Sequence, residues 1–276
     1  MLDAVLLILR EVLEAALIIS LLLALSNKLQ LSYRWSLIAL SAGVAGSGLL
    51  AHYAYEIADA MEGTGQELLN AALYCAVVLS VMVLVFLILP IIYFPARADT
   101  GIDQNRLGRH RHLLYCLFII IVSVSLMREG SEIWIYLSAF VHDQHIFSSA
   151  LIGGAVGAGI GMSLGAIIYY VFSFMPERYF FPTFILIIVL WAGGLAMQIS
   201  KQLMQIDLLS SGAPLWDSTF LVDEHSWLGE LLYALIGYDS RPSLVQGIFY
   251  LLTVAPILLA FIWHAWRQRA IPHEKN

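Results

Sequence analysis

Cysteine and charge are both scarce in this chain. Of its 276 residues only two are cysteines, Cys75 and Cys116, which excludes a disulfide framework and a thiolate metal cage. We expect both to be small buried residues. Only 12% of the residues are charged, whereas 60% are hydrophobic and the mean hydropathy is +0.82. This balance excludes an ordinary soluble protein and indicates a polytopic membrane protein.

Several functional motifs are also absent. The sequence contains no H-E-x-x-H, G-x-S-x-G or Walker motif, so zinc proteolysis, serine hydrolysis and nucleotide-driven pumping lack their residues. No basic stripe lies outside the loops, and we expect no nucleic-acid partner and no permanently bound cofactor. The N-terminus lacks the basic region of a cleavable signal peptide, so we expect the first segment to remain in the mature protein.

Long apolar segments dominate what is present. A membrane-spanning helix needs about 20 mostly apolar residues. On that basis we predict seven spans, near 4–25, 35–58, 68–94, 113–140, 147–175, 181–204 and 244–266. Pro90 and Pro95 end the third span, and Pro182 begins the sixth, where a first turn tolerates proline. The fold class is therefore all-α, and an odd number of spans puts the termini on opposite sides.

The basic residues indicate the direction of the spans. Most of the 14 lie in the loops after spans 1, 3 and 5 and in the tail: Lys28, Arg34, Arg97, Arg106, Arg109, Arg111, Arg178, Arg267, Arg269 and Lys275. Loops rich in Lys and Arg remain in the cytoplasm. We therefore predict a plasma-membrane protein with its N-terminus outside and its C-terminus in the cytoplasm.

The loops on the predicted outer side are acidic. Three-residue steps place Glu56, Asp59 and Glu62 on one helical face, as an acidic group at an outer mouth that would concentrate cations. The segment FVHDQH adds a possible metal relay, formed by His142, Asp143 and His145. The alternatives are ordinary solvated loops and an interfacial polar turn. The amphipathic segment HSWLGELLYALIGY, residues 225–238, is expected to lie on the outer surface.

Two of the predicted spans carry the same ionisable motif. R-E-x-x-E occurs in LREVLEAALIISL, as Arg10, Glu11 and Glu14, and again in LMREGSEIWIYL, as Arg128, Glu129 and Glu132. Spans 1 and 4 run in opposite directions. Small residues follow at four-residue intervals in span 2 and in span 5, and permit close helix packing: Ala39, Gly43 and Ser47, then Gly153, Gly157, Gly161 and Gly165.

This pattern predicts an inverted repeat of spans 1–3 and 4–6 with span 7 appended, an architecture common among transporters. Residues 1–276 form one permease domain. Its halves cover residues 1–100 and 101–205, and an outer segment, 206–243, a final span, 244–266, and a tail, 267–276, follow.

The motifs themselves suggest a metal site. Glutamates three residues apart on a helix point to one face. By rise per residue, Glu11 and Glu14 lie roughly 10–15 Å, and Glu129 and Glu132 roughly 12–17 Å, below the outer ends of their spans. Each charge at this depth costs at least ~2.5 kcal/mol. Four carboxylates form a hard site that favours Mg²⁺, Ca²⁺, Mn²⁺ or Fe³⁺ over soft ions. Arg10 and Arg128 cannot bind metal, and we expect them to hold the carboxylates ionised and oriented.

At these motifs the sequence resembles the oxidase-dependent iron permease family, the Ftr-type proteins and especially their EfeU-like bacterial branch. The resemblance covers nearly the whole chain and includes LWAGGLAMQ in span 6 and SWLGELLYALIGYDSRPS before span 7. It implies a permease that imports Fe³⁺ as its substrate through Glu11, Glu14, Glu129 and Glu132. It also implies extracytoplasmic partners: a ferroxidase or peroxidase, and a metal-binding delivery protein.

Several other functions fit the same motifs. A related branch of the family takes up lead, so another cation such as lead or manganese is an alternative substrate. The site could also belong to a metal sensor that does not transport, or to an intramembrane acid–base enzyme. A purely structural alternative is a pair of salt bridges that locks two helices together without a ligand. Buried ion pairs stabilise poorly compared with hydrophobic packing, so we favour the permease.

Overall fold

The computed structural model describes residues 2–93, 101–141, 143–210, 212–223, 226, 228–229, 232–233 and 237–270. Its helices are α1 (Leu2–Lys28), α2 (Arg34–His52), α3 (Ala54–Asp59), the 3-10 helix η1 (Ala60–Gly63), α4 (Gly65–Ile88), α5 (Gln104–Ser138), α6 (Gln144–Phe174), α7 (Glu177–Gln205) and α9 (Leu244–Ala270). The strands β1 (Ile92–Tyr93) and β2 (Gly101–Ile102) pair antiparallel between α4 and α5, with Ile92 opposite Ile102. Helices make up most of the described residues, as predicted.

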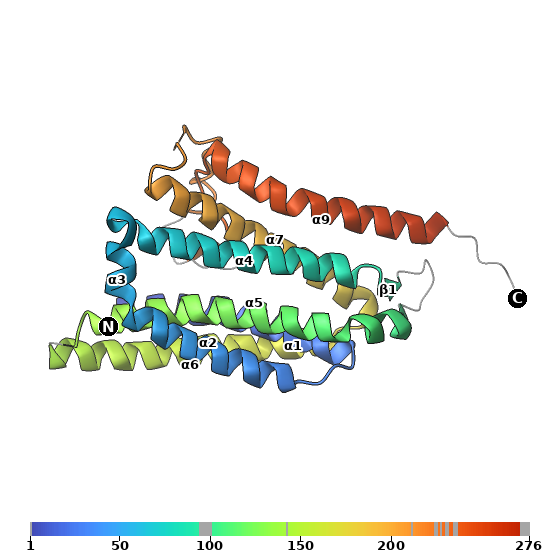
Figure 1. The fold of residues 1–276 in the computed structure, drawn as a ribbon, viewed down its shortest axis with the longest axis horizontal. Helices are drawn as coiled ribbons and strands as arrows, with labels where there is room; N and C mark the ends of the chain where they lie inside the picture. The colour runs from blue at the N-terminus through green and yellow to red at the C-terminus, as the bar shows by residue number, and fades with distance from the viewer. Residues whose placement is uncertain are drawn as a thin grey trace, which may run out of the picture.

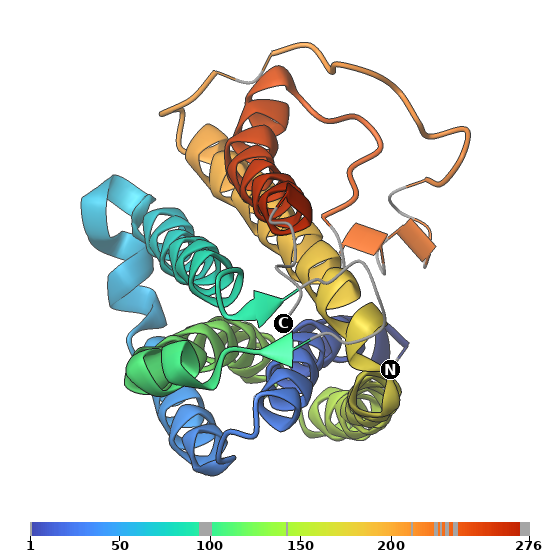
Figure 2. The same ribbon diagram turned by 90° about the vertical axis from the view of Figure 1, so that its right-hand side faces the viewer.

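The long helices lie side by side along one axis, and the start of α1 and the end of α9 lie at opposite ends of the bundle (Figure 1). Within the described residues, six of these helices are long and apolar enough to cross a membrane: α2, α4, α5, α6, α7 and α9. The first helix, α1, is 27 residues long but carries four ionisable residues in its first half: Asp3, Arg10, Glu11 and Glu14. It lies between α5 and α6 in the view along the bundle (Figure 2).

Three predicted helix boundaries differ from the structure. The helix predicted over 35–58 ends at His52, and a short helix, α3, crosses the end of the bundle after Tyr53 (Figure 1). α5 begins at Gln104 instead of 113, because the Asp103 side chain accepts hydrogen bonds from the first backbone amides of the helix. α7 begins at Glu177, so Pro182 lies inside the helix and does not begin it.

Small residues bring the helices into close contact. α1 packs on α6 and α2 on α5. A Cβ atom on Gly157 would lie 2.5 Å from the Val5 carbonyl oxygen, and one on Gly130 would lie 2.7 Å from the Ser47 Cβ. The predicted packing role of the small residues is confirmed at Gly157 and Ser47. Lys28 at the end of α1 adds hydrogen bonds to the carbonyl oxygens of Ser173 and Met175 at the end of α6.

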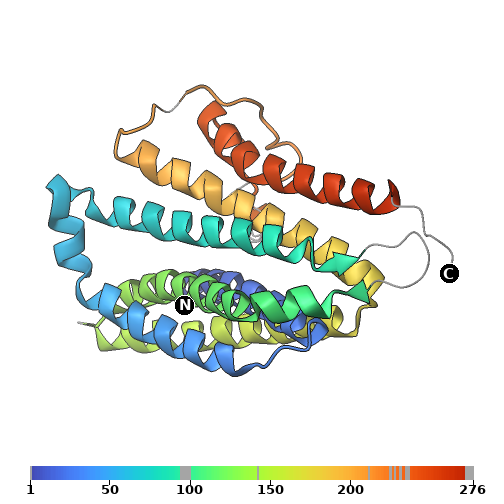
Figure 3. The same cartoon turned by 45° about the vertical axis from the view of Figure 1, so that its right-hand side comes forward.

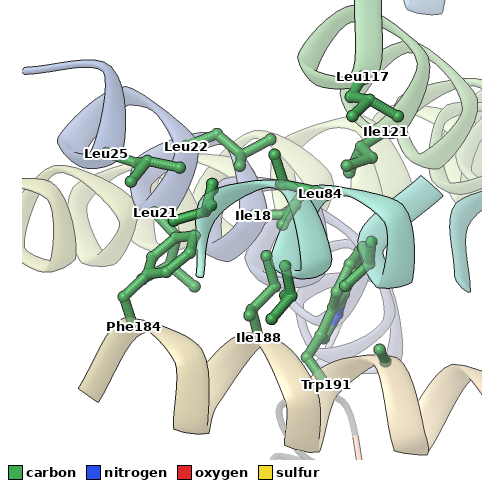
Figure 4. Close-up of a cluster of buried hydrophobic side chains, with 14 of the residues drawn as sticks. Ile18, Leu21, Leu22, Leu25, Leu84, Leu117, Ile121, Phe184, Ile188 and Trp191 are labelled. Carbon is green, nitrogen blue, oxygen red and sulfur yellow. The ribbon is translucent and has the colours of Figure 1, made fainter. Parts of the chain in front are cut away.

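A dense apolar core fills the bundle between the motif residues and the end that carries β1 and β2. Figure 4 shows Leu21, Leu84, Ile121 and Ile188 converging from four helices, and each is at most 1% exposed. This core separates the motif residues from the end of the bundle that carries β1 and β2. The cysteine prediction was wrong, because Cys75 and Cys116 are free and exposed on the outside of the bundle.

α7 and α9 lie side by side (Figure 3). Residues 225–238, which precede α9, were predicted to lie on the outer surface; many of them lie outside the described residues, and the structure corrects the prediction at Gly237. Gly237 has a φ of +68°, and a Cβ there would lie 2.1 Å from the Cα of Gly194. Gly194 lies about 16 Å along α7 from its end at Gln205. The segment therefore dips into the bundle, because two facing glycines let backbone touch backbone.

Candidate metal site

The two R-E-x-x-E motifs meet in the middle of the bundle. α1 supplies Glu11 and Glu14, which are 3% and 1% exposed, and α5 supplies Arg128 and Glu129, which are 5% and 4% exposed. Glu132, one turn further along α5, keeps 35% of its side chain exposed. The pattern of i and i+3 glutamates explains this meeting, since each pair lies on the face of its helix that packs on the other helix.

Arg128 lies at the centre of the cluster. One of its terminal nitrogens, Nη2, is 3.3 Å from Glu14 Oε2 and 3.9 Å from Glu11 Oε2, and it also pairs closely with Glu129. The other, Nη1, is 2.7 Å from Glu132 Oε1. The Tyr74 ring lies against the guanidinium, with its centroid 4.5 Å away. One cation thus contacts all four motif carboxylates and links the two helices.

Arg10 has a different environment although its motif is the same. Its Nε lies 3.4 Å from Glu14 Oε1, and its side chain is 35% exposed. The guanidinium also lies 4.9 Å from the centroid of the Tyr233 ring. Arg10 therefore sits at the edge of the cluster, whereas Arg128 sits inside it. The repeated motif suggests equivalent arginines, and the structure shows that they are not equivalent.

Three of the four glutamates could share an ion. Glu11, Glu129 and Glu132 each offer an oxygen within 4.8 Å of the others. Glu14 is turned toward both arginines. Carboxylate oxygens are hard ligands suited to hard cations. Four carboxylates and two guanidiniums leave an excess of negative charge, which a multivalent cation would neutralise. The arrangement can therefore accept a cation without leaving the cluster strongly charged.

The cluster also includes four side chains that the sequence did not single out: Tyr74, Gln198, Lys201 and Tyr233. The Tyr74 hydroxyl donates to the amide oxygen of Gln198 on α7. Tyr233 is contacted on its ring by Lys201 as well as by Arg10, with the Lys201 nitrogen 5.2 Å from the centroid. A weak signal existed for Lys201, since it is one of few basic residues among acidic loops on the predicted outer side. Gln198 and Tyr233 lie in the stretches LWAGGLAMQ and SWLGELLYALIGYDSRPS that carry the family resemblance, whereas Tyr74 carries no such signal.

The acidic group predicted at the outer mouth is only partly assembled. Glu56 and Asp59 lie on α3 and are exposed. Glu62 does not share their face, because α3 ends at Asp59 and Glu62 adopts a φ of +63°. The expectation of one continuous acidic face was therefore wrong.

The histidine-containing turn has a structural role at Asp143. Its carboxylate accepts hydrogen bonds from the backbone amides of His145 and Ile146 and caps α6. The His145 side chain is exposed. His142 lies outside the described residues. The metal relay therefore remains a hypothesis, with Asp143 already engaged as a helix cap.

Comparison with known proteins places this chain in a family. The model of the iron permease FTR1 family matches residues 1–266. The chain belongs to the iron permease FTR1 family. Membership makes it a permease and not an enzyme, and with its apolar helices it makes the chain a multi-pass protein of the plasma membrane that takes part in iron transport.

Relatives within the FTR1 family cover almost the whole chain. The chain is 26% identical over 267 residues to the ferrous iron permease EfeU of Escherichia coli O6:H1. The aligned region covers 93% of this chain and 94% of that relative. The chain is 26% identical over 261 residues to the protein of that name from Yersinia pestis, with 91% and 90% covered. No solved structure matches the chain.

Proposed function

We propose that this chain imports iron, as Fe³⁺, through the carboxylates of its two R-E-x-x-E motifs. The observation that carries the proposal is the meeting of Glu11, Glu129 and Glu132 from two helices, with oxygens within 4.8 Å of one another. Buried carboxylates are costly in a membrane. A hard multivalent cation offsets that cost, and the FTR1 family supplies the identity of the metal.

The proposed topology has seven spans with the N-terminus outside. The helix packing supports two inverted halves. In such a repeat α1 corresponds to α5, α2 to α6 and α4 to α7. Exchanging the two halves then turns the contact of α1 with α6 into the contact of α5 with α2, and leaves the contact of α4 with α7 unchanged. The structure contains the contact of α1 with α6, its equivalent between α2 and α5, and the contact of α4 with α7. An internal two-fold relation requires this pattern.

The proposed path of the ion begins at Glu132 and Arg10, the two exposed members of the cluster. The ion exchanges its water for the oxygens of Glu11, Glu129 and Glu132, while Glu14 keeps the arginines paired. Release toward the cytoplasm requires the two halves to move, because Leu21, Leu84 and Ile121 close the bundle below the site. With the N-terminus outside, as proposed, this core closes the inner side of the bundle.

The oxidation state of the ion rests on the ligand set. Carboxylate oxygen is a harder donor than imidazole or thiolate, and the more highly charged Fe³⁺ is a harder ion than Fe²⁺. The relatives carry the word ferrous in their names. The ligand set and the names of the relatives agree if iron arrives as Fe²⁺ and an extracytoplasmic ferroxidase or peroxidase oxidises it before it reaches the glutamates. A metal-binding protein then delivers the Fe³⁺ to the permease.

The test is uptake of labelled iron by cells that lack their own iron importers and express this chain. We expect uptake with the wild-type chain and none with Glu129→Gln at equal protein levels. Supply as Fe³⁺-citrate or as Fe²⁺ with ascorbate separates the two oxidation states, and competition by Mn²⁺ or Pb²⁺ tests the alternative cations. Iron binding by the purified wild-type chain without uptake would identify a sensor, and uptake unaffected by Glu129→Gln would overturn the proposed site.

A further inference from the structure

A second polar pocket lies next to the carboxylate cluster. It is a cavity about the size of one water molecule, lined by the polar residues Tyr74, Ser125, Arg128, Glu129 and Trp191 together with apolar side chains of α4, α5 and α7. Ser125 precedes Glu129 by four residues on α5, so both face the same side of that helix. The pocket is thus continuous with the cluster through Glu129.

Two polar groups in this pocket lack a partner among the described residues. The Ser125 hydroxyl and the Trp191 indole nitrogen make no hydrogen bond there, and their residues are 6% and 4% exposed. Serines in these helices usually donate to a carbonyl of their own helix, as Ser123 and Ser131 do on α5. A buried polar group left without a hydrogen bond destabilises the fold. A polar guest in the pocket would remove that cost.

The position of the pocket gives it a place on the route of the ion. Trp191 lies in the same apolar cluster as Leu84 and Ile188, and follows Ile188 along α7 (Figure 4). Along α5, Ser125 is nearer than Glu129 to the end that bears β2. The pocket therefore lies on the side of Glu129 that faces the end bearing β2, and Tyr74 and Trp191 in its lining belong to the apolar core.

We propose that Ser125 and Trp191 form an inner subsite that binds water coordinated to the ion as it leaves the glutamates. This inference rests on the proposed transport function. An indole N–H donates but cannot accept, so it cannot ligate a bare cation, whereas a water oxygen can accept its hydrogen bond. A serine hydroxyl accepts a hydrogen bond from the same water. Glu129 remains a ligand in both positions, so the ion moves by exchanging Glu11 and Glu132 for water.

The experiment separates capture of the ion from its movement inward. We expect Ser125→Ala and Trp191→Phe to bind Fe³⁺ as the wild-type protein does, measured on purified protein in detergent by equilibrium dialysis. We expect their initial rate of iron uptake into cells to fall about tenfold, the effect of losing one hydrogen bond to a ligand of a charged ion. Ser123→Ala and Trp134→Phe are the matched controls, because both residues lie outside the pocket and Trp134 is exposed.

Each outcome decides between specific possibilities. Wild-type uptake rates in both Ser125→Ala and Trp191→Phe would overturn the inner subsite. A parallel loss of binding and uptake, as expected for Glu129→Gln, would also overturn it, because the residues would then only support the carboxylate cluster. Failure of the wild-type chain to take up iron would instead refute the proposed function. Ser125→Ala removes a single oxygen atom, so it keeps the test valid if Trp191→Phe does not fold.

Discussion

Arg128 on α5 lies 3.3 Å from the carboxylate of Glu14 on α1, across 114 residues of chain. This pair joins the two R-E-x-x-E motifs, because each residue also contacts the arginine or a glutamate of its own motif. It is buried in a bundle whose other contacts are largely apolar. Removing one partner would leave the other charge uncompensated, so the pair ties the stability of the bundle to the site.

Glu14→Gln and Glu132→Gln are expected to differ although they occupy equivalent motif positions. Both should abolish iron uptake. Glu14 is 1% exposed and contacts both arginines, so its loss should destabilise the protein by about 3–5 kcal/mol, the cost of an unpaired buried charge. Glu132 is 35% exposed, and its loss should leave the melting temperature in detergent almost unchanged. Retained uptake in Glu132→Gln would argue against its role as a ligand.

Lysine should replace Arg10 better than it replaces Arg128. Arg128 contacts four carboxylates through two nitrogens, a geometry that a single ammonium cannot reproduce. We expect Arg128→Lys to reduce uptake by roughly tenfold or more, as for loss of a charge-assisted hydrogen bond. Arg10 makes one contact with Glu14 and is partly exposed, so Arg10→Lys should retain most of the uptake. Equal effects of the two changes would contradict this asymmetry.

The ring of Tyr233 is expected to matter more than its hydroxyl. Arg10 and Lys201 both lie within 5.2 Å of the ring centroid, and cation–π contacts of this kind contribute about 0.5–2 kcal/mol each. Without the ring, Arg10 is free to pair with carboxylates that would otherwise bind the ion. We therefore expect Tyr233→Ala to weaken iron binding several-fold and Tyr233→Phe to have little effect. Tyr170→Ala, at an exposed ring, is the control.

The contact between α1 and α6 depends on glycine. A Cβ at residue 157 would lie 2.5 Å from the Val5 carbonyl oxygen, whereas one at Gly159 on the same helix meets nothing within 4 Å. We expect Gly157→Ala to destabilise the protein by about 1–3 kcal/mol, as overpacking does, and Gly159→Ala to be neutral. Thermal unfolding in detergent checks both. Equal melting temperatures would show that the helices can separate without cost.

The sequence by itself determined the membrane class, the position of the long helices and the residues of the two motifs. Apolar run length and helical periodicity are local properties, and both can be followed along the chain without knowing what packs on what. The same applies to the small residues of α2 and α6, whose spacing indicates a packing face. The sequence did not predict the end of α2 at His52 or the early start of α5. Caps and bends depend on single side chains and on the packing at the ends of the bundle.

Only the tertiary structure decided which groups share the site and how. The two arginines of the identical motifs have different surroundings. Arg10 contacts the ring of Tyr233, which Lys201 of α7 also contacts. Arg128 contacts the ring of Tyr74 on α4. The pocket at Ser125 and Trp191 likewise forms between α5 and α7, where no sequence spacing relates its members. Distances between residues far apart in the chain follow from the packing of whole helices, and a linear pattern does not contain them.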